Sequence, residues 1–313
     1  MENKGKITIV GSNMVDLVSY LKRTPEKGET VFGKEFLQGF GGKGSNQAVM
    51  ASLLGADVSM ITAIGDDAYG KTWLDQYKAE KINTDAVHVM EGRNSGVAVI
   101  WVESDGDNRI VITPGANEDV TAGLVASSFQ KLPKAAVVLS QLENPQEGIL
   151  EGFKQAKNNG AVTILNPAPA EILQENILTY TDWLVPNESE LALLAKEMFQ
   201  LEEEDPAVLI KKFAEKTKTN IVMTAGPKGA LVYMIDEDMD VEIIPTIQVE
   251  PKDTTGAGDA FCGTFAYALS NGIDPRKAIE LANVIASDSV QRNGTQTSYA
   301  RGEALQKLVN QVL

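Results

Sequence analysis

Short apolar runs alternate with amphipathic segments along most of the chain. The apolar runs predict buried strands at residues 7–10, 58–64, 136–139, 162–165, 183–185, 221–224 and 230–235. The segments between them predict helices at residues 44–54, 71–80, 147–158, 188–198 and 206–216. Continuous apolar strands separated by amphipathic helices are typical of a mostly parallel sheet covered by helices on both faces. We therefore expect an α/β fold.

Polar groups follow several of these expected strands. Asn166, Asn187 and the turn at residues 224–229 each come directly after one. Ligands of parallel α/β sheets bind at the carboxyl ends of the strands, so we expect these groups to lie on one rim.

Two segments interrupt the alternation of strand and helix. Residues 14–40 and 95–113 are rich in strand-forming residues and contain no helical pattern. Within the second segment, residues 96–102 and 109–113 flank a turn at Asp105-Gly106, which predicts a hairpin. We expect both segments to form a small β-sheet that serves as a lid on a single domain spanning residues 1–313.

Composition narrows the classes of partner. A formal charge of −15 disfavours nucleic acid and anionic membranes, which require clustered Lys and Arg. The sole cysteine, Cys262, leaves no internal disulfide, which fits a cytoplasmic location. The sole histidine, His88, lies in a strand-like run, which argues against histidine-based triads and multi-histidine metal sites.

The most informative motif is Asp253-Thr254-Thr255-Gly256-Ala257-Gly258-Asp259, which leads directly into an apolar helical run. A glycine turn that opens a helix directs unpaired N–H groups and the positive end of the helix dipole at one spot, which suits an anion such as phosphate. A carboxylate in that first turn is well placed to take a proton from an attacking hydroxyl. The alternative is an ordinary helix start with a favourable first-turn Asp.

A second glycine cluster runs from Gly39 to Asn46 and contains a literal G-x-G-x-x-G. A dinucleotide fingerprint would lie in the first strand-to-helix turn, whereas a β-rich segment separates this cluster from the first strand. Adjacent glycines allow close approach of a ligand, and Lys43 and Asn46 offer donors to hydroxyls. A polyol fits that mixture.

Residues 65–72 match the P-loop expression literally. Asp66 and Asp67 would then lie inside a loop that should hold phosphates, which is electrostatically unfavourable. We expect instead a loop near the polyol site, with Lys71 on a solvated helix face.

Three further motifs supply polar groups at strand ends. Asn187 and Glu190 have the spacing of a capping box, and they could also contact Mg²⁺ and phosphate through water. The turn at residues 224–229 is either a simple connection or a phosphate contact that includes Lys228. Glu143 follows a buried strand and suits sugar hydroxyls.

Taken together and in this order, these motifs resemble the ribokinase family of sugar kinases over essentially the whole chain. The matching segments are residues 11–16, 41–48, 141–143, 166–170, 186–190, 224–229 and 253–259. The resemblance implies an ATP-dependent kinase with an α/β core, a β-sheet lid and dimerisation through that lid.

The resemblance also implies residue roles. It implies that Asp259 is the base for the sugar 5-hydroxyl, and that the N–H groups of Gly256, Ala257 and Gly258 form the anion hole. The implied sugar contacts are Asn13, Met14, Asp16, Gly41, Gly42, Lys43, Asn46 and Glu143. The implied nucleotide contacts are Asn187, Glu190, Thr224, Ala225, Gly226, Pro227, Lys228, Gly229, Gly258 and Asn283, with Asn187 and Glu190 also placing Mg²⁺. The implied K⁺ site comprises Asp253, Thr255, Ser289, Arg292, Gly294 and Ser298.

One departure from the family pattern concerns Met14. Many members carry asparagine at this position, on the 2-hydroxyl side of the sugar, whereas deoxyribokinase-like relatives share methionine. A thioether is a weak acceptor and no donor, so the pocket should not strongly reject 2-deoxyribose. We expect D-ribose as substrate, with 2-deoxy-D-ribose, a hexose or nucleoside, and a non-catalytic sugar-binding regulator as alternatives.

Overall fold

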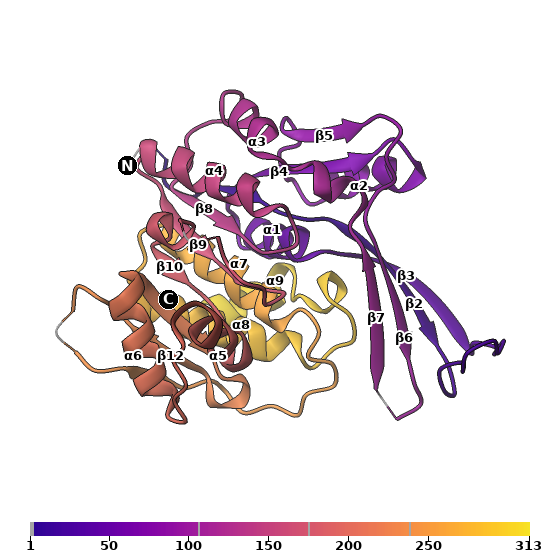
Figure 1. The fold of residues 1–313 in the computed structure, drawn as a ribbon. Helices are drawn as coiled ribbons and strands as arrows, with labels where there is room; N and C mark the ends of the chain where they lie inside the picture. The colour runs from indigo at the N-terminus through magenta and orange to yellow at the C-terminus, as the bar shows by residue number, and fades with distance from the viewer. Residues whose placement is uncertain (1–2, 106, 175, 238) are drawn as a thin grey trace.

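The computed structural model describes residues 3–105, 107–174, 176–237 and 239–313 (Figure 1). Within these residues nine strands form one sheet, in the order β13 (Glu242–Ile244), β12 (Ala230–Tyr233), β11 (Asn220–Thr224), β10 (Trp183–Leu184), β9 (Val162–Leu165), β8 (Val137–Ser140), β1 (Lys6–Val10), β4 (Asp57–Gly65), β5 (Val87–Met90). All neighbours are parallel except that β12 runs antiparallel to β11 and β13. The expected mostly parallel α/β sheet is confirmed.

Helices cover both faces of this sheet. One face packs against α1 (Lys43–Leu53), α2 (Ala68–Ala79), α7 (Ala257–Ser270), α8 (Pro275–Ser289) and α9 (Gly302–Val309). The other packs against α3 (Ala122–Phe129), α4 (Gln146–Asn158), α5 (Glu188–Phe199) and α6 (Pro206–Thr217). Along β1, Ile7 and Ile9 enter the first core and Val10 enters the second, because successive strand side chains point to opposite faces. This double burial explains why the strands are mostly apolar, with only small polar residues such as Thr8 and Thr163 buried among the apolar ones.

Four more strands of the described chain form a separate small sheet, in the order β3 (Glu35–Gly41), β2 (Met14–Tyr20), β6 (Val97–Val102), β7 (Asn108–Thr113). In Figure 1 these strands project from the main body on the side of α2. The predicted hairpin of β6 and β7 is confirmed, although Gly106 of its expected turn lies outside the described residues. β2 pairs antiparallel with β3 and parallel with β6, and residues 21–34 contain no strand.

The remaining elements are short. They are the 3-10 helices η1 (Gly115–Asp119), η2 (Leu178–Tyr180), η3 (Gly226–Lys228) and η4 (Gln296–Ser298). His88 lies in β5, as expected, with its Nε2 at 2.8 Å from Ser128 Oγ. None of the helices in the described ranges combines the length and apolar character needed to cross a membrane.

Candidate active site

The carboxyl ends of the parallel strands surround a cavity of 220 Å³, here called the catalytic cavity. Asn166 follows β9, Asn187 follows β10, and Thr224 ends β11; all three line it together with Asp259. The expectation that these polar groups share one rim is confirmed. The complete lining is Lys43, Asn166, Ala168, Val185, Asn187, Glu190, Thr224, Thr254, Gly256, Gly258, Asp259 and Cys262.

The glycine turn before α7 supplies free amides to this cavity. Gly256 is the N-cap residue and adopts a left-handed conformation with φ of 76°, which disfavours any residue with a side chain. The N–H of Ala257 donates to Thr254 O at 3.3 Å. Within the described chain, the N–H groups of Gly256 and Gly258 have no hydrogen-bond partner. Unpaired amides and the positive end of α7 therefore lie at the cavity wall, where an anion is stabilised.

Asp259 occupies the first turn of α7 and is 7 % exposed. Its carboxylate accepts hydrogen bonds from Asn46 Nδ2 and Gln47 Nε2, both at 2.9 Å. A carboxylate offers about four lone-pair sites, so two bonds leave capacity to accept a proton. The side chain is thus held at the cavity while remaining competent as a base.

Asp16 lies close to Asp259 and Glu143. Burial, followed by the charges of Glu143 and Asp259, raises the pKa of Asp16 to about 7. A Cβ added to Gly41 would lie 2.2 Å from Asp16 Oδ1, so glycine allows the carboxylate to approach the backbone of β3. Gly42 has φ of 82° and caps α1, which the glycine pair in the sequence anticipates.

Lys43 and Glu143 are two further charged residues that interact with Asp259 at this site. The Glu143 carboxylate accepts from the Lys43 N–H at 2.8 Å and from the Ser12 hydroxyl, and burial raises the pKa of Glu143. Burial lowers the pKa of Lys43, but the nearby carboxylates, led by Asp259, outweigh it and leave this pKa above its ordinary value. Lys43 therefore remains an ammonium group among carboxylates.

A second cavity of 340 Å³, here called the apolar cleft, adjoins the first. The two share Thr224, Thr254 and Gly258, so they meet at the glycine turn. The complete lining is Thr224, Gly226, Pro227, Gly229, Thr246, Ile247, Val249, Pro251, Thr254, Ala257, Gly258, Phe261, Asn283, Ala286, Ser287 and Val290. Mostly apolar walls with a few polar groups suit a flat heterocycle.

Not every expected nucleotide contact faces this cleft. Asn283 lines it, although its amide donates to Ile244 O at 2.9 Å. Ala225 is buried but does not line it. The Lys228 side chain is largely exposed, with its Nζ 3.9 Å from Glu188.

The predicted capping box at α5 is confirmed. Glu190 N donates to Asn187 Oδ1 and Asn187 N donates to Glu190 Oε2, each at 2.8 Å. Burial raises the pKa of Glu190 despite the Asn187 bond. Both residues also line the catalytic cavity, so the capping role and a ligand role are compatible.

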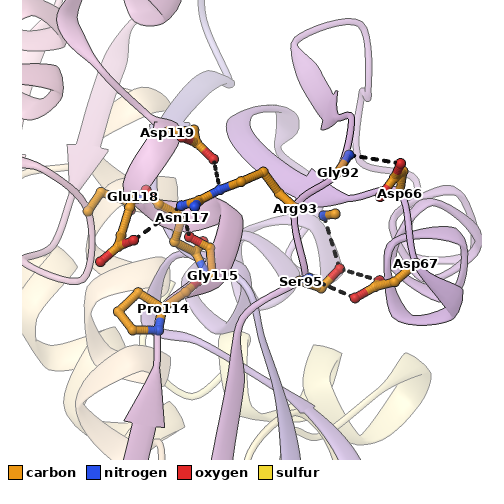
Figure 2. A network of polar contacts seen from close by, with 12 residues as sticks. Asp66, Asp67, Gly92, Arg93, Ser95, Pro114, Gly115, Asn117, Glu118 and Asp119 are labelled. Atoms are coloured by element: carbon orange, nitrogen blue, oxygen red, sulfur yellow. Dashed lines mark hydrogen bonds and ion pairs between the residues drawn. The ribbon is translucent and has the colours of Figure 1, made fainter.

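The P-loop-like segment serves a structural purpose (Figure 2). Asp67 caps α2 by accepting from Gly70 N at 2.8 Å, and it also binds the N–H and hydroxyl of Ser95. Asp66 accepts from Gly92 N at 3.0 Å. Lys71 is exposed, as expected. The two carboxylates of this loop are therefore bound by N–H and hydroxyl groups of the protein itself.

The residues of the expected K⁺ site lie on two segments, the loop before α7 and the stretch from the end of α8 to η4. The Asp253 carboxylate accepts from Thr255 N at 2.9 Å and Gly294 N at 2.8 Å. Arg292 Nε donates to Ser298 O at 2.7 Å, and the Ser289 hydroxyl donates to Ala286 O at 2.8 Å. In the described ranges, no cluster of three or more His, Cys, Asp or Glu side chains could hold a metal ion.

Two residues at the start of β2 differ in their surroundings. The Asn13 side chain is fully buried and donates to Thr62 Oγ1 at 2.8 Å and Ala63 O at 3.0 Å, so it points into the core. Its side-chain NH₂ group is thus engaged within the protein, and its place among the sugar contacts stays a prediction. Met14, in contrast, lines an open groove of 580 Å³ together with Glu143, and Asn117 Nδ2 lies 3.7 Å from its sulfur.

Sequence reasoning overlooked the amides behind Asp259. Gln141 Nε2 donates to Gln47 Oε1 at 2.6 Å, and Gln296 Nε2 donates to Asn46 Oδ1 at 3.0 Å. Gln47 and Gln141 lie within the motifs quoted above, which was the only available signal. Glutamine in a helix or loop otherwise carries no pattern.

A family model described as pfkB family carbohydrate kinase matches residues 4–301. The chain belongs to the pfkB family of carbohydrate kinases. The ribokinase of Bacillus subtilis (strain 168) is 37 % identical over 304 residues, covering 97 % of this chain and 99 % of that protein. The deoxyribokinase of Salmonella typhi is 36 % identical over 296 residues, covering 94 % and 95 %.

A solved structure extends the comparison. The Arabidopsis thaliana ribokinase complexed with ribose and ATP superposes with a TM-score of 0.86 at 27 % identity, covering 97 % of this chain and 98 % of that one. Within the pfkB family, the chain therefore shares its fold with an enzyme whose complex holds both a pentose and a nucleotide.

Proposed function

We propose that this carbohydrate kinase is a ribokinase, which transfers the γ-phosphoryl group of ATP to the 5-hydroxyl of D-ribose. The observation that carries the proposal is the junction of the two cavities. There the Asp259 carboxylate lies beside the free amides of Gly256 and Gly258. The similarity to curated ribokinases supports the sugar assignment.

In this proposal Asp259 removes the proton of the sugar 5-hydroxyl as its oxygen attacks phosphorus. A positioned general base contributes roughly 10²–10⁴ in rate. The N–H groups of Gly256 and Gly258 stabilise the transferring phosphoryl group, and one such donor is worth about 3–4 kcal/mol. Ala257 N–H joins them when it leaves Thr254 O, to which it now donates at 3.3 Å. Phosphoryl transfer relies mostly on this kind of positioning and charge stabilisation.

The sugar would lie between Asp16, Lys43 and Glu143. Carboxylates accept hydrogen bonds from hydroxyls, and the ammonium group donates them. Gly41 lets the Asp16 carboxylate approach β3, and Gly42 packs directly against the backbone of Asn13 and Met14, so both glycines help to place the groups proposed to hold the sugar. The Asn46 amide carries two donors, so it can donate to a sugar hydroxyl either in addition to Asp259 or in its place.

The nucleotide would bind with its base in the apolar cleft and its phosphates directed at the glycine turn. Thr224, Gly226, Pro227, Gly229 and Asn283 line that cleft. Mg²⁺ favours oxygen ligands and keeps several waters, and it neutralises charge on the phosphates when bound. Only Oε2 of Glu190 accepts the Asn187 N–H, so the other oxygen is available to such an ion through water. Asn187 would assist through the same water shell.

A monovalent cation, K⁺ by preference, would bind the two loops joined by Asp253. The Asp253 carboxylate joins the two segments by accepting from Gly294 N, and it braces its own loop, directly before the glycine turn, by accepting from Thr255 N. Carbonyl and hydroxyl oxygens of Asp253, Thr255, Ser289, Arg292, Gly294 and Ser298 would serve as ligands. The ion would hold the turn in shape.

We further propose that the small sheet acts as a lid on the single domain and as the interface of a homodimer. Phe32, Phe36, Ile110 and Val111 on this part of the chain are exposed, Phe32 at 95 % and Val111 at 62 %. Those within the strands lie on both faces of the small sheet, and exposed apolar surface of this kind is typical of interaction sites. Lid closure would exclude water and limit ATP hydrolysis. The buried state of the single thiol, Cys262, is compatible with a cytoplasmic location.

The second candidate substrate is 2-deoxy-D-ribose. Met14 offers only a weakly accepting sulfur to the groove that it shares with Glu143. A site without a polar partner for a hydroxyl discriminates weakly against the sugar that lacks it. The 36 % identity to a deoxyribokinase is consistent with this alternative.

A coupled assay of ADP release across pentoses, hexoses and nucleosides tests the proposal. We expect the largest kcat/KM with D-ribose, followed by 2-deoxy-D-ribose. A large preference for deoxyribose would reverse the two pentoses, turnover of nucleosides alone would refute the sugar assignment, and sugar binding without turnover would indicate a regulator.

A further inference from the structure

Gln47 is a buried amide that touches Asp259 without touching either cavity. It lies in α1, is 0 % exposed and is absent from the lining of both the catalytic cavity and the apolar cleft. Its Nε2 donates to Asp259 Oδ1 at 2.9 Å and to Asn166 Oδ1 at 3.1 Å. Gln47 can therefore affect the chemistry only through its two acceptors in the cavity, Asp259 and Asn166, and Asp259 is the one proposed as base.

The direction of the amides follows from the charge of Asp259. An amide can present either its oxygen or its NH₂ group, whereas an ionised carboxylate only accepts. Gln47 must direct its NH₂ group at Asp259, which leaves its oxygen facing Gln141. Gln141 must then present its own NH₂ group, and its Nε2 lies 2.6 Å from Gln47 Oε1. In the chain of hydrogen bonds from Gln141 to Gln47 to Asp259, here called the relay, each amide therefore has one favourable orientation, with its NH₂ group on the side of Asp259.

Close backbone packing fixes the position of Gln47. A Cβ added to Gly263 of α7 would lie 2.5 Å from the Gln47 carbonyl oxygen, so α1 and α7 are in contact one turn beyond Asp259. A Cβ on Gly44 would lie 2.5 Å from Ser12 N, so α1 also packs against the chain that follows β1. Gln47 is consequently held on a rigid element on both sides.

Asn46 donates to the other carboxylate oxygen, but it is also a proposed sugar contact. If Asn46 turns to the sugar, Gln47 supplies the remaining fixed donor to Asp259. A carboxylate with one fixed donor keeps its plane and its distance from the glycine turn. Displacing a reacting group by about 1 Å can cost on the order of 10²-fold in rate.

We propose that Gln47 is a positioning residue that holds Asp259 in its reactive orientation, with Gln141 fixing the Gln47 amide. The role of Asp259 as base rests on the proposed kinase function. Gln47 lines neither the catalytic cavity nor the apolar cleft, so its removal should lower kcat and leave the binding of sugar and nucleotide largely unchanged.

Two variants test the relay. Gln47→Met keeps the length of the side chain and removes both donors, and we expect kcat to fall about 10- to 100-fold with KM values changed less than about twofold. Gln141→Met releases the Gln47 amide and should lower kcat in the same direction by a smaller factor. It also carries the test alone if Gln47→Met does not fold. Gln155→Met is the matched control, because Gln155 also donates to a carboxylate, Glu151, but on α4; its kcat should equal that of the wild type.

A double-mutant cycle separates positioning from general structure. In an Asp259→Asn background, Gln47→Met should change the residual turnover, measured with radiolabelled ATP, by less than about twofold. An equal fold-loss in both backgrounds, or a raised sugar KM with normal kcat, would overturn the proposal. All ratios are measured with the sugar that the wild type phosphorylates best, so a wild type inactive on ribose refutes the proposed function and leaves this test intact.

Discussion

The Asp67 carboxylate binds Ser95 twice, accepting its N–H at 2.8 Å and its hydroxyl at 2.7 Å (Figure 2). Ser95 stands just before β6, where the chain passes from the main body into the small sheet. Arg93 reaches in the other direction, with Nε 2.7 Å from Asp119. The start of the small sheet is therefore tied to α2 on one side and to η1 on the other.

Asp67→Ala should destabilise the protein by about 1–2 kcal/mol, because it removes an N-cap and leaves the Ser95 N–H unpaired. Thermal unfolding measures this loss as a lower Tm. Asp66→Ala, which removes only an exposed bond to Gly92, is the control and should have a smaller effect. Equal Tm values for Asp67→Ala and wild type would show that the Asp67–Ser95 bonds do not stabilise the fold.

The same contact has a pH signature. Burial raises the pKa of Asp67, but hydrogen bonds from Ser95 and Gly70 outweigh burial and hold this pKa below its ordinary value. A depressed folded-state pKa contributes stability that is present above the unfolded value and lost as pH falls through the folded one. The Tm difference between wild type and Asp67→Ala should accordingly shrink in acid.

Lys71→Ala distinguishes a structural role of residues 65–72 from that of a phosphate-binding P-loop. Lys71 is exposed on α2, and the loop before it is filled by its own carboxylates. We expect kcat/KM for ATP to change less than about twofold, as for most surface substitutions away from a site. A loss of turnover by orders of magnitude would reinstate the P-loop interpretation.

The sequence predicted the main sheet well because its strands are buried on both faces. Ile7, Ile9 and Val10 are buried, and the one polar residue among them, Thr8, is buried as well, so no exposed position in this run suggests another element. The strand β13 escaped prediction because Glu242 and Ile243 are not buried, so no apolar run marks it. The parallel pairing of β2 with β6 could not be foreseen either, because it joins segments far apart in the chain.

The site was predictable where backbone geometry demands a residue type. Gly42 and Gly256 have positive φ, and glycine in a motif reports that demand directly. Asn13 shows the opposite case, because its place beside Met14 does not reveal that its side chain turns towards Thr62. Gln47 was invisible for the same reason, because its role depends on a partner 212 residues away in sequence.

Sugar affinity should depend on pH through Asp16. Burial, Glu143 and Asp259 raise the pKa of Asp16 to about 7, so the free site is largely protonated below that pH. If the ionised form binds hydroxyls, KM for ribose should rise about tenfold from pH 8 to pH 6. Asp16→Asn should raise KM at both values and remove this dependence.

The pH dependence of stability that Asp16 confers should have the opposite sign to that conferred by Asp67. A raised folded-state pKa contributes stability that is complete below the unfolded value and is lost as pH rises through about 7. The ligand-free wild type should therefore lose Tm relative to Asp16→Asn between pH 5 and pH 8. A constant difference would show that Asp16 titrates normally.

Asp259→Asn should abolish most turnover while leaving the sugar bound. An amide cannot take the hydroxyl proton, so we expect kcat to fall by roughly 10²–10⁴. Isothermal titration with ribose should give a dissociation constant close to that of the wild type. Near-normal turnover would assign the base to another residue.

Turnover should be faster in K⁺ than in Na⁺ at equal ionic strength. Asp253 joins the loop before the glycine turn to Gly294, and a bound cation would hold both loops in place. Because the larger ion suits ligands set by backbone carbonyls, Na⁺ should shape the turn less well. Asp253→Asn should reduce the salt preference by loosening the loops, whereas Asp288→Asn, which removes only an ion pair with Arg292, should retain most of it. Equal wild-type rates in both salts would exclude the cation site and leave the Asp253 bonds as a purely internal support for the turn.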